Sequence, residues 1–126
     1  MTIPSTDTTA HGEASFVCHV TTARVSAYPD PLILAASEQV TLGENDTTWP
    51  RFVWCTTRQG KSGWVPDAYL DQRGTMGTLL RAYDATELAI DVGEELAVRD
   101  EEGGWLWCVN RAGERGWVPM ENVAIP

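Results

Sequence analysis

The sequence predicts an all-β protein made of two small β-barrels that lie in tandem and pack together. Three observations favour this fold class: a long internal repeat, many short β-prone runs separated by Gly and Pro, and the lack of any helical period longer than about one turn. Short strands at regular spacing with such punctuation are typical of small closed or nearly closed barrels.

The internal repeat is the strongest of these observations. Residues 52–66 recur 53 positions later as residues 105–119. The matching pairs are Trp54 and Trp107, Cys55 and Cys108, Gly60 and Gly113, Gly63 and Gly116, Trp64 and Trp117, Val65 and Val118, and Pro66 and Pro119. Repetition at this period indicates two copies of one small unit. Each copy is near the lower size limit for independent folding, so we expect the two copies to pack into one rigid body.

The first unit is expected at residues 15–72, after a flexible, polar N-terminal tail at residues 1–14. Alternating or β-branched runs predict its strands, and the Gly-containing turn at residues 58–62 predicts a hairpin that ends at Pro66. The strands are expected at residues 16–20, 23–28, 39–42, 52–57 and 63–65.

The second unit is expected at residues 78–126, where the same order of runs returns. The first unit is expected to end with a single helical turn at residues 67–70, and a short connector at residues 73–77 separates the two units. The connector contains two glycines and is too short to act as a long flexible linker.

Charge limits the possible partners. The chain carries 9 basic and 18 acidic residues, a formal net charge of −9, which makes nucleic acid a poor partner and a basic protein a better one. No apolar run approaches the roughly 18 residues of a membrane span, and the N-terminus lacks the pattern of a secretory signal. The sequence therefore predicts a cytoplasmic protein with no membrane partner.

Catalytic and metal-binding motifs are absent from the sequence. It contains no nucleophile elbow, phosphate loop or HExxH motif, and its two histidines, His11 and His19, lie in or near the expected tail. Cys18, Cys55 and Cys108 are widely spaced, which favours reduced, buried thiols over a disulfide framework or a zinc site. We therefore expect no enzyme activity, no cofactor and no metal.

Four motifs of the second half occur in the order of a known family. They are Leu80-Arg81-Ala82-Tyr83-Asp84, Glu87-Leu88-Ala89-Ile90 with Gly93-Glu94-Glu95-Leu96, Gly104-Trp105, and Gly116-Trp117-Val118-Pro119. This order resembles the Src-homology-3 (SH3) domain, in a variant form of bacterial type. The first half resembles it more weakly, through Ala27-Tyr28, Ser37-Glu38-Gln39-Val40 and the segment from Gly63 to Tyr69. Together the two resemblances cover about residues 18–124 and imply tandem SH3-like domains.

The resemblance implies that each unit is a five-stranded barrel with an aromatic groove that docks a polyproline helix. Asp30, Ala85 and Asn122 stand where the family has tyrosines, and the groove of the first unit is the more complete. The implied ligand-binding residues are Tyr28, Phe52, Pro66 and Tyr69 in the first unit and Tyr83, Trp105 and Pro119 in the second.

The predicted function is a non-enzymatic module that binds a protein or an extended peptide, either basic or proline-containing. The alternative is a small acidic immunity or antitoxin-like inhibitor of one folded basic partner. Trp64 and Trp117 are interpreted as structural residues that close a barrel end or join the barrels. The acidic run at residues 100–102 is either a solvated surface or a rim that selects basic ligands.

Overall fold

The computed structural model describes residues 16–26 and 30–126. This part of the chain forms twelve β-strands and two single 3-10 turns, with no α-helix, which confirms the all-β class. No helix in the described residues is long and apolar enough to cross a membrane. The predicted tail at residues 1–14 lies outside the described residues.

The first five-stranded sheet has the strand order β5-β4-β3-β7-β6 and contains only antiparallel pairs. Its strands are β3 (Gln39–Asn45), β4 (Phe52–Thr56), β5 (Ser62–Pro66), β6 (Leu70–Arg73) and β7 (Met76–Leu79). The predicted hairpin joins β4 to β5, and the predicted helical turn follows Pro66 as η1 (Asp67–Tyr69). We call residues 39–79 the first unit.

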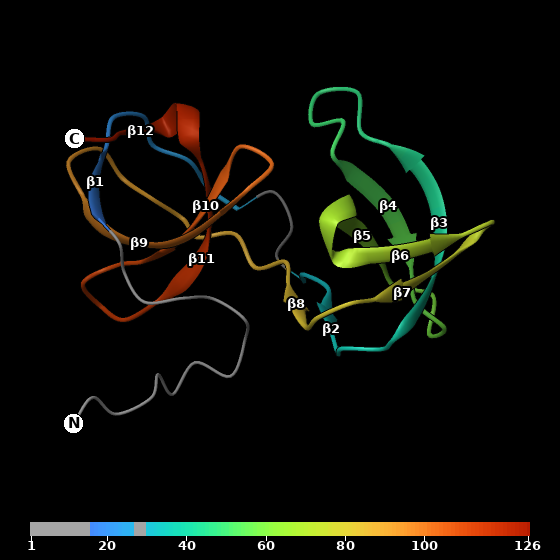
Figure 1. The fold of residues 1–126 in the computed structure, drawn as a ribbon. Helices are drawn as coiled ribbons and strands as arrows, with labels where there is room; N and C mark the ends of the chain where they lie inside the picture. The colour runs from blue at the N-terminus through green and yellow to red at the C-terminus, as the bar shows by residue number, and fades with distance from the viewer. Residues whose placement is uncertain (1–15, 27–29) are drawn as a thin grey trace.

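The second five-stranded sheet has the order β11-β10-β9-β1-β12. Its strands are β1 (Phe16–Val20), β9 (Glu95–Glu102), β10 (Trp105–Val109), β11 (Arg115–Pro119) and β12 (Val123–Ala124), with η2 (Met120–Asn122) before the last. We call this sheet and its turn the second unit. It therefore joins the beginning of the described chain to its end, as Figure 1 shows.

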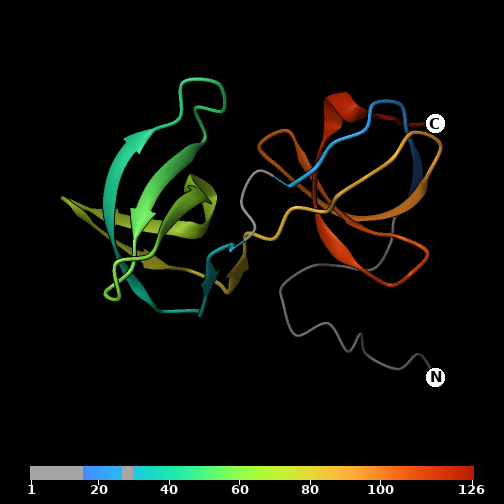
Figure 2. The ribbon, with the colours of Figure 1, turned by 180° about the vertical axis from the view of Figure 1, so that it is seen from behind.

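A small third sheet lies between the two units. It consists of β2 (Ile33–Leu34) and β8 (Tyr83–Asp84), which pair in antiparallel orientation. Both strands belong to segments that pass from one unit to the other, as the view from behind shows (Figure 2). Two segments of the chain thus connect the units, and they are hydrogen-bonded to each other through β2 and β8.

The first strand of each repeat lies in the sheet of the other repeat. β1 lies between β9 and β12, with Cys18 opposite Leu96 and Val20 opposite Val123. β7 lies between β3 and β6, with Val40 opposite Gly77. The two repeats have therefore exchanged their first strands.

This exchange differs from the expected boundaries in two places. The expected first unit, residues 15–72, includes β1, which pairs with the second unit. The expected connector, residues 73–77, is instead the turn and first part of β7 in the β6–β7 hairpin. Both differences have one cause: periodicity marks a run as a strand, but it does not say which sheet the strand joins. The division of the chain into two SH3-like domains that pack into one rigid body remains a prediction.

Two clusters of buried side chains form the core. One cluster lies inside the second unit and contains Cys18, Val20, Leu88, Ile90, Leu96, Val98, Leu106, Cys108 and Val118. The other extends from the first unit to four aromatic residues outside it, Tyr83, Trp105, Trp107 and Trp117. β10 is consequently buried on both faces, because Cys108 points into one cluster and Trp107 into the other. The two units therefore share apolar surface, which favours one rigid body.

Two repeat-equivalent glycines should differ in their tolerance of a methyl group. A Cβ on Gly116 would lie 2.5 Å from the backbone nitrogen of Leu88, whereas a Cβ on Gly63 would lie 2.9 Å from the side-chain Cδ1 of Leu32. Backbone cannot move aside as a side chain can. We expect Gly116→Ala to lower the free energy of unfolding by about 1–3 kcal/mol or more, and Gly63→Ala by clearly less. Urea denaturation of both variants checks this, and equal losses would contradict it.

Candidate functional site

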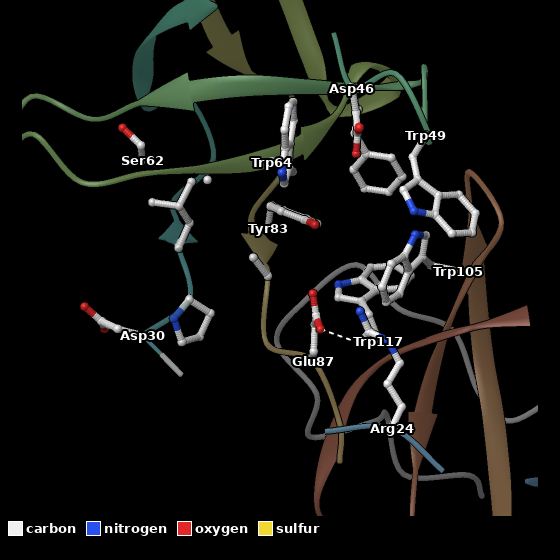
Figure 3. A pocket seen from close by; sticks show the side chains of 15 residues that line it. Arg24, Asp30, Asp46, Trp49, Ser62, Trp64, Tyr83, Glu87, Trp105 and Trp117 are labelled. Carbon is white, nitrogen blue, oxygen red and sulfur yellow. Dashed lines mark hydrogen bonds and ion pairs between the residues drawn. The ribbon is translucent and has the colours of Figure 1, made fainter. Parts of the chain in front are cut away.

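A cleft of about 220 Å³ lies between the two units and is lined by residues of both. Six aromatic side chains converge on it, namely Trp49, Phe52, Trp64, Tyr83, Trp105 and Trp117 (Figure 3). Trp49, Phe52 and Trp64 come from the first unit, whereas Trp105 and Trp117 come from the second. The cleft thus exists only where the units meet.

Trp49 reaches the cleft from the loop between β3 and β4. Side-chain hydrogen bonds help to hold this loop: Asn45 Nδ2 donates to the Pro50 carbonyl at 2.8 Å, and the Thr48 backbone N–H donates to Asp46 Oδ1 at 3.1 Å. The Trp49 ring centroid lies 5.4 Å from that of Trp105, with an interplanar angle of 57°. This tilted pair forms one end of the cleft.

A glycine pair in the second unit makes this approach possible. Gly103 and Gly104, between β9 and β10, have φ angles of +58° and +93°, which favour glycine. A Cβ on Gly104 would lie 2.8 Å from a ring carbon of Trp49, and one on Gly103 would lie 2.8 Å from Phe52 Cε1. The turn therefore supplies both the backbone conformation and the space that the first unit needs.

Trp117 and Tyr83 form the inner wall of the cleft. Trp117 Nε1 donates a hydrogen bond to the Asp84 carbonyl at 2.8 Å, and its ring lies 5.2 Å from Trp107 and 6.2 Å from Tyr83. Tyr83 in turn contacts Tyr69 in an edge-on geometry at 5.0 Å. A series of ring contacts thus leads from the cleft into the shared core. Trp117 contacts residues at the junction of the two units, which agrees with a structural role for it.

Four charged residues border the cleft. Arg24 forms an ion pair with Glu87, and its guanidinium lies 4.9 Å from the centroid of the Trp105 ring. Asp30 forms an ion pair with Lys61 at 2.8 Å. Asp46 is the fourth charged residue that lines the cleft. A guanidinium therefore already lies against the aromatic wall, and the border carries three carboxylates.

The acidic run at residues 100–102 faces the first unit. Asp100 pairs with Arg81 at 3.6 Å, and the Arg81 guanidinium lies 4.4 Å from the centroid of the Tyr69 ring. Burial, together with Asp100 and Glu102, raises the pKa of Tyr69 to about 12, against the opposing effect of Arg81. Burial and the neighbouring Asp100 and Glu101 also raise the pKa of Glu102. Asp100 in this acidic run thus already has an ion-pair partner within the chain, Arg81.

The structure brings together three of the seven predicted ligand-binding residues: Phe52, Tyr83 and Trp105 all line the cleft. Tyr69 is buried behind Tyr83, and Pro66 and Pro119 are buried where each 3-10 turn begins. These three do not line the cleft. Tyr28 lies outside the described residues.

Sequence reasoning did not identify Trp49 and Arg24 as site residues, and for Trp64 and Trp117 it favoured a structural role over ligand binding. Trp49 carried one usable signal, because it is a large aromatic residue at the end of an otherwise polar loop. Arg24 carried none, since an arginine in an alternating run is typical of an exposed strand position.

The three cysteines are buried, free thiols. Cys55 lies in the cluster that the two units share, and Cys18 and Cys108 lie in the core of the second unit. Burial raises the pKa of Cys55 to about 11 and raises the pKa values of Cys18 and Cys108 as well. Protonated, buried thiols are poor nucleophiles and poor metal ligands. Among residues 16–26 and 30–126, no three potential metal ligands from His, Cys, Asp and Glu gather together.

Comparison with protein families supports an SH3-like domain in the second half of the chain. The family model of the variant SH3 domain matches residues 80–125. Searches of curated proteins and of solved structures returned no match. SH3-like domains are typically non-catalytic modules that bind proteins or peptides, so the match indicates a protein-binding module. It does not include β1, which completes the second sheet from the other repeat.

Proposed function

We propose that the chain forms two SH3-like barrels in tandem and binds an extended segment of a protein partner in the cleft between them. The observation that carries the proposal is the convergence of six aromatic side chains from both units on one cleft. Aromatic rings give a large contact area at a low cost in side-chain entropy, and they stack well on proline rings. One composite site thus replaces a separate groove in each unit.

The charges around the cleft favour a partner that is basic or contains proline. Asp30, Asp46 and Glu87 outnumber Arg24 in the lining, although Asp30 and Glu87 already pair with Lys61 and Arg24, and the whole chain has a net charge of −9. An acidic border attracts Lys and Arg side chains and disfavours acidic segments. The Trp105 face that Arg24 covers is itself a cation–π site.

Trp49→Ala tests the proposal. Trp49 is half-buried and comes from a loop, so its removal should leave both sheets folded. Binding of a partner recovered from native lysate should weaken at least tenfold, since loss of one central aromatic residue in an interface costs about 2 kcal/mol or more. Isothermal titration calorimetry measures the effect. Phe16→Ala is the control, because Phe16 is an exposed aromatic residue of β1 that does not line the cleft.

The inhibitor alternative predicts a different result. One tight, salt-sensitive, folded basic partner whose affinity is unchanged by Trp49→Ala would favour an acidic inhibitor surface over a peptide cleft. The same measurement, repeated at two salt concentrations, distinguishes the two functions.

A further inference from the structure

The cleft is bordered by one edge of β5, and the hydrogen bonds of the β4–β5 hairpin show which groups this edge presents. The Thr57 N–H donates to the Lys61 carbonyl at 2.8 Å, and the Asp67 N–H donates to the Arg51 carbonyl at 2.7 Å. Hydrogen-bonded and non-hydrogen-bonded pairs alternate along an antiparallel ladder. The register of β4 and β5 therefore makes Trp54 and Trp64 a non-hydrogen-bonded pair. The N–H and C=O groups of Trp64 consequently point away from β4.

The equivalent edge in the second unit is filled by the chain itself. There the Asn110 N–H donates to the Glu114 carbonyl at 3.0 Å, so the same alternation turns the backbone of Trp117 outward. The Trp117 N–H donates to the Thr86 carbonyl at 2.8 Å, and the Leu88 N–H donates to the Trp117 carbonyl at 3.1 Å. Residues 86–88 thus pair with β11 in parallel orientation, through the bridge of Glu87 to Trp117.

Beside the first unit, residues 30–32 lie at the place that corresponds to residues 86–88, but they do not pair with β5. Residues 30–32 and 62–64 both line the cleft, with Asp30 at the same end of it as Ser62 (Figure 3). Among the described residues, no backbone hydrogen bond joins the two segments. A Cβ on Gly116 would meet the backbone of Leu88, whereas one on Gly63 would meet only the side chain of Leu32. The backbone at residues 30–32 is therefore farther from β5 than residues 86–88 are from β11. The β5 edge opens into the cleft instead.

We infer that the bound segment adds to the β5 edge as an extra, parallel strand, paired with the outward N–H and C=O groups of Trp64. This inference rests on the proposed function and specifies its binding mode. Strand addition at a sheet edge gives affinity through backbone hydrogen bonds, and alternate side chains then give selectivity. Residues 86–88 on β11 are the template for the geometry.

The occupant is an extended segment of a basic protein partner. Asp30 lies at the same end of the cleft as Ser62, where it pairs with Lys61, and Asp46 lies beyond Trp64 (Figure 3). The lining carries three carboxylates against the one guanidinium of Arg24. The residue of the partner that donates to Trp64 must carry an N–H, so proline is excluded there and tolerated at the neighbouring position. A polyproline helix in the same cleft forms no backbone ladder with β5, so it would not exclude proline at every second position.

The probe for the test is the tightest binder from a phage-displayed library of random dodecapeptides selected on the full chain. Amide exchange by NMR should show at least tenfold slower exchange of the Trp64 N–H when this peptide is bound. The Trp117 N–H should not change, because it already donates to Thr86 within the chain. N-methylation of successive peptide residues should weaken binding at least tenfold at every second position.

The outcomes separate the binding mode from the proposed function. A peptide that loses affinity in Trp49→Ala, but neither slows exchange of the Trp64 N–H nor shows the alternating N-methyl pattern, would overturn strand addition alone. A library without any binder, or a binder indifferent to Trp49→Ala, would overturn the proposed function and strand addition with it. Slow exchange at Trp64 with the alternating pattern supports both.

Discussion

Cut at Gly74, the chain should give two fragments that are unfolded alone and that fold together when mixed. Gly74 lies at the exposed turn between β6 and β7, so the cut itself removes no core contact. The fragment of residues 1–74 lacks β7, and the fragment of residues 75–126 lacks β1. Each fragment then contains the strand that the other lacks.

The expected effect is large because both exchanged strands lie inside a sheet. β7 lies between β3 and β6 and buries Leu79, and β1 lies between β9 and β12 and buries Cys18 and Val20. Each buried aliphatic side chain is worth about 1.5–3 kcal/mol, and loss of a central strand also removes two hydrogen-bonded ladders. A small domain is stable by only about 5–15 kcal/mol, so neither fragment should retain a fold.

Circular dichroism and proton–nitrogen NMR of each fragment, before and after mixing, provide the measurement. Val20→Asp in the first fragment should prevent reassembly, because Val20 is buried in the second unit. Val17→Asp is the matched control, since Val17 in the same strand is 39% exposed and lies opposite Ala97. Two fragments with well-dispersed spectra that do not associate would show that the repeats fold as separate domains.

Local sequence signals predicted β1, β3, β4 and β5 but not all of their partners. The strand expected at residues 23–28 is only an isolated bridge at Arg24 in its described part, and β6 and β7 were not predicted as strands. The turn at residues 58–62 and the stop at Pro66 fix the β4–β5 hairpin, because a hairpin needs only neighbouring residues. β1, in contrast, pairs with β9 and β12 across more than 70 residues. Such long-range pairing depends on which surfaces remain uncovered after local elements form, and no pattern within residues 16–20 carries that information.

The structure places only some of the predicted site residues together, for a related reason, and their role in binding stays a prediction. Phe52, Tyr83 and Trp105 were identified through a resemblance that treats each unit by itself, yet they meet in one cleft because the units lie against each other. Pro66 and Pro119 hold equivalent places in the two repeats and are buried in both. The cleft residue Trp49 lies in a loop whose length differs between the repeats, so repeat comparison could not identify it.

Trp117→Ala should destabilise the protein far more than Trp64→Ala, although the two residues are equivalent in the repeat. Trp117 is only 4% exposed, contacts Trp107 and Tyr83, and donates a hydrogen bond to the Asp84 carbonyl. We expect its loss to lower the free energy of unfolding by about 3–5 kcal/mol. Trp64 is half-buried and contacts Trp54 at 4.8 Å, so its loss should cost about 1–2 kcal/mol.

Urea denaturation of both variants measures the difference, and Trp117→Phe separates its two causes. Phenylalanine keeps most of the buried apolar area but leaves the Asp84 carbonyl without its donor, so this variant should lose about 1–2 kcal/mol. Equal losses for Trp117→Ala and Trp64→Ala would contradict the structural role of Trp117. Both tryptophans line the cleft, but Trp117 is a buried member of the core cluster that the two units share, whereas Trp64 is only partly buried against that cluster.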